Sequence, residues 1–301
     1  AGQDRTRLRR YLLAMAIDFT LTPELDELRL RIRAFVDDVI KPTEAELTDP
    51  DHIEDRAEYL TKLIGMRTQA QAAGIWLPHM PEEWGGMGLG HVELAMVQAE
   101  AAKAYYGPFV FNCMAPDEGN MHTLLNWATD EQKEKYLRPL CEGTAMSCFA
   151  MTEPEVAGSD PTLIRTHAVQ DGDEWVINGH KWFISNARRA KFAILICRTE
   201  DNPDLPQAAN TAFIVDIPSE GWNRVREVET MHGGTGHSEI VIEDLRVPAA
   251  HMLGGRGQGH MLGQYRLGPA RLAHCMRWIA QAETALDMMV ERSLERFSHG
   301  S

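Results

Sequence analysis

The sequence predicts an α+β multidomain protein, with an N-terminal α-helical domain, a middle antiparallel β sheet or barrel, and the start of a C-terminal helical bundle domain. Apolar residues recur at three- and four-residue steps in the first half of the chain, which is typical of amphipathic helices. From Cys148 onward, short runs of β-forming residues alternate with Gly, Pro and Asp. The chain has 301 residues, 44% of them hydrophobic, so it can bury a large core divided over about two domains.

The N-terminal half is expected to be helical. Thr22 is suited to cap the first helix, with Pro23 in its first position, and Pro42 is expected to end it. A second helix is predicted over residues 56–73, ending at Gly74. Later segments comprise a loop of turn-forming residues over 81–88 and helices over 92–104, over 118–127 and from 130 to Pro139.

The middle of the chain is expected to form a sheet or barrel of roughly 100 residues. β-forming residues fill Trp175–Ser185, in which Asn178-Gly179 predicts a turn. Further β-rich runs cover residues 192–197, 212–217, 225–228 and 239–247.

A helical pattern returns over residues 267–297, after a glycine-rich loop. A helix of this length normally packs against several others, and we expect it to open a domain that is truncated in this chain. Residues 1–14 are interpreted as an extension, with an Arg-rich transit peptide as the alternative. The expected division is therefore an extension over 1–14, a helical domain over 15–147, a β domain over 148–255 and the first part of a helical domain over 256–301.

Composition excludes several classes of protein. The net charge of −14 without long runs of like charge argues against a nucleic-acid surface, so an anionic ligand would need a local basic site. The five cysteines form no CxxC pair and the twelve histidines lack zinc-binding spacing, which predicts no metal site. The cysteine usage indicates a reducing compartment, the cytoplasm, or a mitochondrion or peroxisome in a eukaryote. No apolar run approaches the roughly 18 residues of a membrane span.

Two motifs carry chemical information. The loop Thr152–Asp160, with sequence TEPEVAGSD, combines hydroxyls with a glycine that lets a ligand approach the backbone, which suits a flat polar ring with phosphates. The alternative is an ordinary turn, because the same residues are common in turns. Phe183 and Ser185 lie two apart on a predicted strand, so one ligand could meet a ring and a hydroxyl together. The alternative for Phe183 is a core residue.

These two motifs, followed by Ile240–Pro248, resemble in their order the acyl-CoA dehydrogenase family of flavoproteins. The resemblance runs from about Ile17 to Gly300. The first motif has Glu155-Val156 where most relatives carry one glycine, and it is similar to the subgroup of acyl-CoA dehydrogenase family members 10 and 11. The resemblance implies FAD as cofactor, and no G-x-G-x-x-G segment following a strand competes for that assignment.

The resemblance also implies the binding residues. It assigns FAD to Phe149, Met151, Thr152, Gly158, Ser159, Phe183, Ile184, Ser185 and Arg296. It assigns the acyl-CoA to Ser159, Gly268, Pro269, Ala270 and Arg271. Arg271 would be the local cation that an acidic protein needs for this anion, with a solvated helix charge as the alternative. Arg296 would reach the flavin of a neighbouring subunit, with a charge at a frayed helix end as the alternative.

The implied reaction is α,β-dehydrogenation of an acyl-CoA in fatty acid β-oxidation. A carboxylate takes the α-proton, the β-hydride goes to the flavin, and the electrons pass to an electron-transfer flavoprotein. No base is identified in the chain: Ala270 stands where some relatives carry the glutamate, and Glu153 and Asp160 are interpreted as structural. We expect the base beyond Ser301, so a protein of 301 residues would have little or no activity.

The resemblance further implies a homodimer or homotetramer. Two alternative functions stay open at this point. The same fold could serve a flavin oxidase or monooxygenase, in which reduced flavin meets oxygen. The chain could also be a non-catalytic module that binds flavin or protein.

Overall fold

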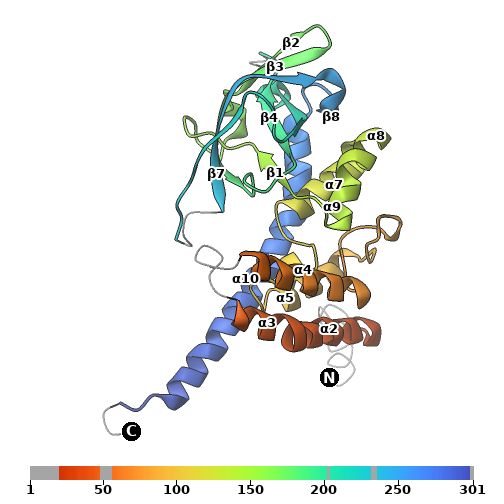
Figure 1. Cartoon of the computed structure of the whole chain (residues 1–301), viewed down its shortest axis with the longest axis vertical. Coiled ribbons are helices and arrows are strands. Elements are labelled where there is room, and N and C mark those ends of the chain that lie inside the picture. The colour runs from red at the N-terminus through yellow and green to blue at the C-terminus, as the bar shows by residue number, and fades with distance from the viewer. Residues whose placement is uncertain (1–19, 48–55, 202–203, 232–235, 299–301) are drawn as a thin grey trace, which may run out of the picture.

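The computed structural model describes residues 20–47, 56–201, 204–231 and 236–298. Helices form one end of the molecule and a β sheet forms the other, and the long helix α10 runs along both (Figure 1). The arrangement confirms the predicted order of a helical region, a sheet region and a further helix. The predicted extension over residues 1–14 lies outside the described residues.

The helical region begins with α2 and is capped as predicted. The Thr22 hydroxyl accepts a hydrogen bond from the Leu25 amide at 3.3 Å, and Pro23 occupies the first turn. The helices are α2 (Pro23–Phe35), the π-helical η1 (Val36–Ile40), α3 (Lys41–Glu46), α4 (Arg56–Ala72), the 3-10 helix η2 (Glu82–Trp84), α5 (His91–Ala101), α6 (Gly107–Val110), α7 (Asp117–Trp127), α8 (Asp130–Gln132), the π-helical η3 (Lys133–Leu137) and α9 (Arg138–Glu142).

Two prolines do not end helices where the sequence predicts it. Pro42 lies in the first turn of α3 and Pro139 in the first turn of α9, and the chain stays helical through both. A proline ring in a helix clashes with the carbonyl four residues earlier. A π-helical turn directly precedes each of these helices, and its wider spacing accommodates the ring. The helix that contains Pro139 ends instead at Gly143, in the left-handed conformation with φ of 73°.

The sheet region contains eight strands in one sheet that is not closed into a barrel. The order is β6-β7-β3-β2-β4-β5-β8, with β1 paired to β4 off this path. Most pairs are antiparallel, as predicted, but β1 with β4 and β2 with β4 are parallel. The strands are β1 (Ser147–Ala150), β2 (His167–Asp171), β3 (Glu174–Ser185), β4 (Phe192–Arg198), β5 (Asn210–Asp216), β6 (Trp222–Glu227), β7 (His237–Pro248) and β8 (Met252–Leu253), with the 3-10 helices η4 (Pro161–Leu163), η5 (Pro206–Ala209) and η6 (Ala249–His251) between them.

The predicted turn at Asn178-Gly179 is wrong, because β3 continues through both residues. The pairing of β3 with β7 shifts register between Ile177 and Gly179, so this dipeptide forms a bulge. The Asn178 side chain accepts from the Asp244 amide at 2.8 Å and donates to the Asp244 carboxylate at 3.1 Å. A Cβ at position 179 would lie 2.2 Å from the Thr166 hydroxyl oxygen, so glycine is required here for close packing.

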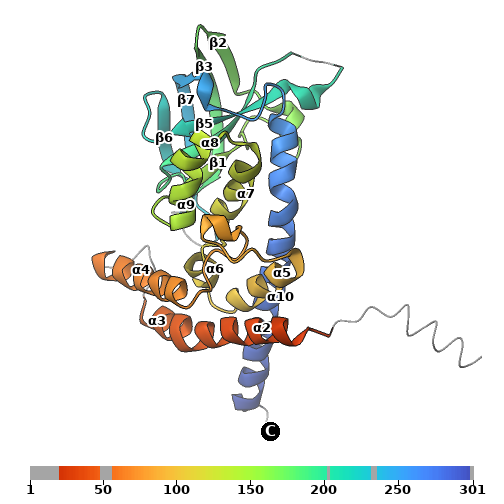
Figure 2. The same cartoon turned by 90° about the vertical axis from the view of Figure 1, so that its right-hand side faces the viewer.

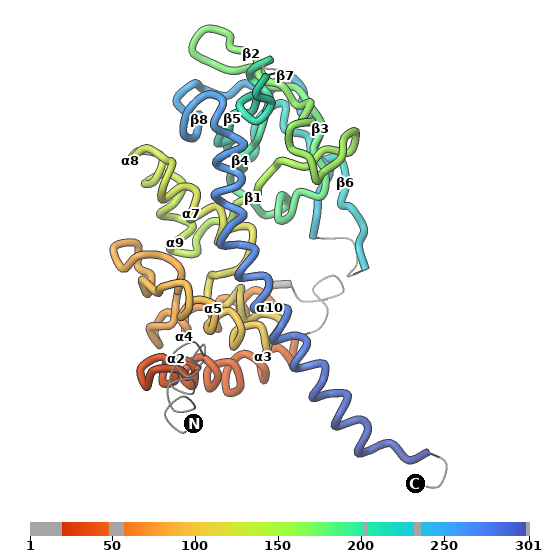
Figure 3. Tube along the Cα trace, turned by 180° about the vertical axis from the view of Figure 1, so that it is seen from behind, coloured from red at the N-terminus to blue at the C-terminus, as the bar shows by residue number. Residues whose placement is uncertain are grey.

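Helix α10 (Gly259–Glu295) begins eight residues before the predicted start at 267. A Cβ at position 259 would lie 2.8 Å from the Thr211 carbonyl carbon, so this glycine lets the helix start against β5. From there the helix passes α7 and α5 and extends beyond the other helices (Figures 2 and 3). Its first half is partly buried, and from Gln281 onward most of its residues are exposed. The helix thereby connects the sheet to the N-terminal helices.

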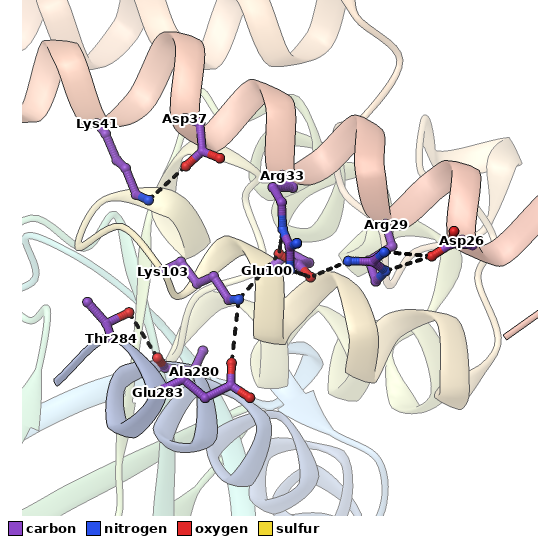
Figure 4. A network of polar contacts seen from close by, with 10 residues as sticks. All are labelled: Asp26, Arg29, Arg33, Asp37, Lys41, Glu100, Lys103, Ala280, Glu283 and Thr284. Carbon is purple, nitrogen blue, oxygen red and sulfur yellow. Dashed lines mark hydrogen bonds and ion pairs between the residues drawn. The ribbon is translucent and has the colours of Figure 1, made fainter. Parts of the chain in front are cut away.

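A polar network fastens α10 to the N-terminal helices (Figure 4). Glu100 at the end of α5 is buried and accepts from Arg33 of α2 at 2.8 and 3.0 Å. Arg29 of α2 lies 3.4 Å from the same carboxylate. Lys103 lies between Glu100, at 3.9 Å, and Glu283 of α10, at 3.4 Å. Several of these side chains line a cavity of about 380 Å³ between α2, α3, α5 and α10.

Candidate functional site

The loop that contains the first motif follows β1 and lies beside β3. The backbone amide of Trp182 donates to the carbonyl oxygen of Thr152 at 3.0 Å, which joins the two motifs directly. Phe149, Met151 and Thr152 are partly buried at the start of this segment. The start of the first motif and the residue before Phe183, 30 residues apart in the sequence, therefore lie side by side.

Glu153 is structural, in agreement with its interpretation from the sequence. Its carboxylate forms an ion pair with Lys181 of β3 at 2.8 Å, with both side chains buried. It also accepts from the amides of Arg165 and Thr166 at 2.7 and 2.9 Å. Burial raises the pKa of Glu153, but the charge of Lys181 and these hydrogen bonds outweigh it and hold the pKa below its ordinary value. Lys181 also donates to the Met151 carbonyl at 2.9 Å, so the pair anchors the loop to the sheet.

Asp160 closes the loop and is structural as well. Its carboxylate accepts from the Thr162 amide at 3.0 Å and from the Thr162 hydroxyl at 2.6 Å, which caps the short helix η4. Gly158 and Ser159 precede it and are exposed. A Cβ at position 158 would lie 3.0 Å from the Thr152 methyl carbon, so glycine gives the loop its close turn there. Both residues are thus accessible, and their contact with a pyrophosphate stays a prediction.

Phe183 has an unusual conformation for an aromatic residue in a strand. Its φ is 53°, in the left-handed region that β-sheet aromatics rarely adopt, and its side chain is 43% exposed. The register of β3 against β7 shifts between Lys181 and Ile184, and both of these residues are buried. Trp182 and Phe183 between them therefore both keep exposure. Backbone strain of this kind is typical of functional sites.

Ser185 and Phe183 share a neighbour that the sequence reasoning did not assign to the site. The Ser185 hydroxyl lies 2.9 Å from Nδ1 of His237, and the Phe183 ring centroid lies 6.2 Å from the His237 ring. His237 starts β7, directly opposite Ser185 in the antiparallel register. Ile184, the remaining predicted flavin contact on β3, has a buried side chain, which leaves its backbone for any contact. Pairing β3 with β7 would have revealed His237.

Three residues from different elements pack together next to β1, namely Phe149, Gly119 and Arg266. The Arg266 guanidinium of α10 lies over the Phe149 ring, with Cζ 4.2 Å from the ring centroid. A Cβ at position 119 of α7 would lie 3.1 Å from the same Cζ. Arg266 was missed by the sequence reasoning. The signal for it is its position on the buried face of α10, in line with Leu262, Ala270 and Ala273.

The predicted acyl-CoA residues lie on the same helix. Arg271 and Gly268 are exposed, and Ala270 is buried. No hydrogen bond or ion pair engages Arg271 within the described part of the chain. Pro269 lines a narrow cavity of about 20 Å³ between α10 and α5. The segment therefore offers an exposed cation, Arg271, on a helix whose Pro269, Leu272 and Ala273 line an apolar crevice that Arg271 itself does not line.

Arg296 is the one predicted flavin contact that the structure does not bring near the others within the chain. It is exposed and caps the C-terminal end of α10. It lies 30 residues from Arg266 along the helix, about 45 Å at 1.5 Å per residue. Its predicted contact with the flavin of a neighbouring subunit stays a prediction.

Three or more His, Cys, Asp or Glu side chains nowhere gather in a metal-binding group within the described residues. Nor does the described part of the chain contain a helix with the length and apolarity needed to cross a membrane.

Comparison with known proteins gives two family matches. Residues 22–144 match the description "Acyl-CoA dehydrogenase, N-terminal domain", and residues 148–245 match "Acyl-CoA dehydrogenase, middle domain". The two matched segments include the loop after β1 and the paired segments of β3 and β7.

Individual proteins of the same family are also similar to this chain. Acyl-CoA dehydrogenase family member 11 of Homo sapiens is 35% identical over 292 residues, which cover 93% of this chain and 37% of the relative. Probable acyl-CoA dehydrogenase FadE2 of Mycobacterium tuberculosis is 34% identical over 289 residues, covering 94% of this chain and 70% of the relative. A solved structure described as "a putative acyl-CoA dehydrogenase from Mycobacterium abscessus" is 34% identical, with a TM-score of 0.86, covering 94% of this chain and 73% of that one. The subgroup predicted from the longer first motif is thereby confirmed.

Proposed function

This chain belongs to the acyl-CoA dehydrogenase family, and we propose that it binds FAD and takes part in the α,β-dehydrogenation of an acyl-CoA thioester. The observation that carries the proposal is the junction of the two motifs. The Trp182 amide is bonded to Thr152, and beside it an exposed Phe183 is held in a strained backbone conformation. An exposed aromatic ring, kept at a conformational cost and adjacent to hydroxyls, suits a planar ligand.

The residues present fit FAD. Phe149, Met151 and Thr152 would contact the flavin ring from the loop, and Phe183 and Ser185 from β3. The exposed Gly158 and Ser159 would take the pyrophosphate. When bound, FAD supplies the two-electron acceptor that amino acid side chains lack.

Ser185 has a defined part in this site. Its hydroxyl can donate to the ligand while its oxygen accepts a hydrogen bond from Nδ1–H of His237, or it can donate a hydrogen bond to Nδ1 instead. The 2.9 Å contact fixes the position of the oxygen in either case. Ser185 is thus a pre-oriented polar contact at the edge of the Phe183 ring.

Arg271 supports an anionic thioester as substrate. The protein carries a net charge of −14, which disfavours anions in general. The exposed Arg271 guanidinium, without a partner in the described residues, provides the local attraction. We propose that Gly268, Pro269, Ala270 and Arg271, with Ser159, contact the acyl-CoA.

The catalytic base is proposed to come from outside the described residues. The carboxylates nearest to the first motif are engaged, Glu153 by Lys181 and Asp160 by Thr162. Glu155 accepts from the His180 ring at 2.6 Å. Each of these carboxylates therefore has a structural partner that competes with a proton-abstracting role.

The chain spans 37% of the length of family member 11 of Homo sapiens, so the activity, substrate and partners of the whole protein remain proposals. We propose an electron-transfer flavoprotein as electron acceptor, a homodimer or homotetramer as the assembly, and fatty acid β-oxidation as the setting. A solved structure of similar fold, at 28% identity, is described as the electron transferring flavoprotein of Acidaminococcus fermentans. The family resemblance supports the dehydrogenase over the oxidase.

Anaerobic reduction of the bound flavin tests the proposal. The protein is first saturated with FAD and then titrated with butyryl-, octanoyl- and palmitoyl-CoA while flavin absorbance and enoyl-CoA formation are followed. We expect one FAD per chain and, when the base is supplied by a longer form of the protein, bleaching by at least one thioester. Binding of FAD without bleaching in that longer form would favour the non-catalytic flavin module. Reoxidation by air at the speed of turnover would favour the oxidase.

A further inference from the structure

Arg266 is a buried cation without an ion-pair partner among the described residues. Its side chain lies in the first half of α10, and the residue is 7% exposed. Nε donates to the Asn120 side-chain oxygen at 2.8 Å and Nη2 to the Pro116 carbonyl at 3.2 Å. In the described part of the chain, no carboxylate lies within hydrogen-bond or ion-pair distance of it. Burial lowers the pKa of Arg266 to about 10, so the side chain is still charged at neutral pH.

Arg277, three turns further along the same helix, shows the usual arrangement. It is equally buried, but it forms an ion pair with Glu118 at 3.3 Å and donates to the Gln98 side chain at 3.0 Å. Leaving a buried charge unpaired costs several kcal/mol in general, so such a residue is rare. Within one helix, therefore, one buried arginine is ion-paired and the other has only neutral hydrogen-bond acceptors and an aromatic ring.

The surroundings of Arg266 form a fitted slot. On one side its guanidinium carbon lies 4.2 Å from the centre of the Phe149 ring. On the other side it lies against Gly119, where a Cβ would come within 3.1 Å of it. Any larger residue at position 119 would displace the guanidinium. The planar group is therefore held between α7 and the ring of β1.

Hydrogen bonds extend from this slot into β1. Asn120 accepts from Arg266 and donates to the Ser147 hydroxyl at 2.8 Å and to the Cys148 carbonyl at 3.3 Å. The Ser147 amide and hydroxyl in turn donate to Asp117 at 2.7 and 2.5 Å. β1 leads directly into the loop that carries Thr152. Arg266 thus fixes both a ring and the strand that support this loop.

We propose that Arg266 is a positioning residue of the flavin site, which holds Phe149 and β1 in place and brings to that ring a positive charge without a direct ion-pair partner among the described residues. The inference rests on the proposed function, in which Phe149 contacts the flavin. The charges of Glu118 and Asp117 act on Arg266, but neither carboxylate forms an ion pair with it, so the field of the guanidinium is offset only in part. A positive charge favours reduced flavin over oxidised flavin, because reduction adds negative charge. The chain would therefore bind reduced flavin more tightly than it would without Arg266.

The test uses FAD-loaded wild-type protein and three variants. Arg266→Met removes the charge, Arg266→Gln removes the charge but keeps a hydrogen-bond donor for Asn120, and Arg266→Lys keeps the charge without the planar fork. Arg277→Met is the matched control, because Arg277 lies on the same helix and is ion-paired. The readouts are the midpoint potential of the bound flavin, the affinity for oxidised FAD, and thermal unfolding of the apoprotein.

We expect the midpoint potential to become more negative in Arg266→Met and Arg266→Gln and to stay near the wild-type value in Arg266→Lys. A tenfold loss of preference for reduced flavin corresponds to about 30 mV for a two-electron couple. Arg277→Met should lower thermal stability and should move the potential less than Arg266→Met does, because Arg277 acts on the site only through Glu118, which both arginines share. Arg266→Gln keeps a hydrogen-bond donor for Asn120. If Arg266→Met does not fold, the potential measured in Arg266→Gln therefore shows whether the charge of Arg266 affects the flavin.

An unchanged potential in Arg266→Gln, with FAD bound, would overturn the inference and leave a structural role. In that case the wild type would still bind FAD and be reduced by acyl-CoA, so the proposed function would stand. Failure of the wild type to bind FAD would instead overturn the proposed function and this inference together.

Discussion

Lys181 and Arg266 are both buried cations that contact the segment leading into the first motif. They differ in whether a carboxylate is paired with them. Lys181 donates to the Met151 carbonyl and is paired with Glu153 at 2.8 Å, so its charge is cancelled within the sheet. Arg266 lies over Phe149 and has only neutral acceptors among the described residues. The ion pair of Lys181 holds the loop in place. Arg266 also holds its neighbours in place, but because it has no direct ion-pair partner, its positive charge can in addition stabilise negative charge nearby. The comparison separates a residue that only stabilises the structure of the site, Lys181, from one that we also expect to change the potential of the flavin, Arg266.

The largest expected effect is on the paired cation. Lys181→Met leaves the Glu153 carboxylate buried without its cation, which should lower the free energy of unfolding by about 3–5 kcal/mol. Urea unfolding of the apoprotein measures this loss. The control is Lys135→Met, which breaks an exposed pair with Asp216 and should cost about 0–1 kcal/mol.

The double variant Glu153→Leu with Lys181→Met sharpens this prediction. Replacing both members of a buried pair with apolar residues is often close to neutral, so much of the lost stability should return. A double variant as unstable as Lys181→Met alone would mean that the loss comes from packing and not from the unpaired carboxylate.

Compared with Lys181→Met, Arg266→Met should lose less stability but should shift the midpoint potential of the flavin. The variant leaves the Asn120 oxygen and the Pro116 carbonyl without a donor, which costs about 1–3 kcal/mol for each buried group. It also removes the cost of burying an unpaired charge, which offsets part of that loss. Urea unfolding of Arg266→Met and Lys181→Met under the same conditions measures both losses. An equal loss of unfolding free energy in the two variants would contradict the distinction between the two cations.

A moderate effect is expected at Phe183. Its left-handed backbone favours glycine, so Phe183→Gly should be more stable than Phe183→Ala by about 1 kcal/mol. Both variants lack the ring and should bind FAD more weakly than the wild type. Thermal unfolding and FAD titration of the pair separate backbone strain from ring contact, and equal stability of the two variants would remove the argument from strain.

The smallest effect is expected at His180, which bridges the first motif and β7. Its ring nitrogens lie 2.6 Å from Glu155 and 2.8 Å from Glu239, and Glu239 is also paired with Arg226 of β6. Carboxylates only accept, so both contacts are hydrogen bonds only when the ring carries two protons. Burial lowers the pKa of His180, but these two carboxylates outweigh it and raise the pKa above 6.5.

The sign of the pH dependence follows from this raised pKa. The stabilisation is fully present below about pH 6.5, the ordinary value for His, and is lost as the pH rises through the folded-state value. The difference in melting temperature between the wild type and His180→Gln should therefore be larger at about pH 5.5 than at about pH 8.5. Glu155→Gln should reduce the same difference, and a gap between wild type and His180→Gln that does not change with pH would contradict the bridge.

Local signals in the sequence were sufficient for much of the fold. The Thr22 cap, the glycine ends of helices and the β-rich runs are encoded within a few residues, and the structure has them. The turn predicted at Asn178-Gly179 failed because its outcome depends on pairing with Asp244, which is distant in sequence. Pro42 was misjudged because a π-helical turn absorbs it.

The candidate site divides in the same way. The structural role of Asp160 was predictable from its local sequence, because its carboxylate bonds Thr162 two residues away. Glu153 was also interpreted correctly as structural, but its partners lie 12 to 28 residues away, so short-range geometry does not explain them. His237 and Arg266 were not identified, since each reaches the site through tertiary pairing, with Ser185 across two strands and with Phe149 across a helix and a strand. The residues that hold the two motifs together are therefore those that one-dimensional patterns do not show.

The central claim is that the loop after β1 and the bulged end of β3 form one FAD site. Equilibrium titration of the apoprotein with FAD tests it most directly, in the wild type, in a double variant Thr152→Val with Ser185→Ala, and in the control Ser219→Ala, whose hydroxyl bonds the Asp216 carbonyl. We predict one FAD per chain, unchanged affinity in the control, and at least about tenfold weaker binding, or about 1.4 kcal/mol, in the double variant. Absence of binding, or equal affinity in all three proteins, would contradict the account.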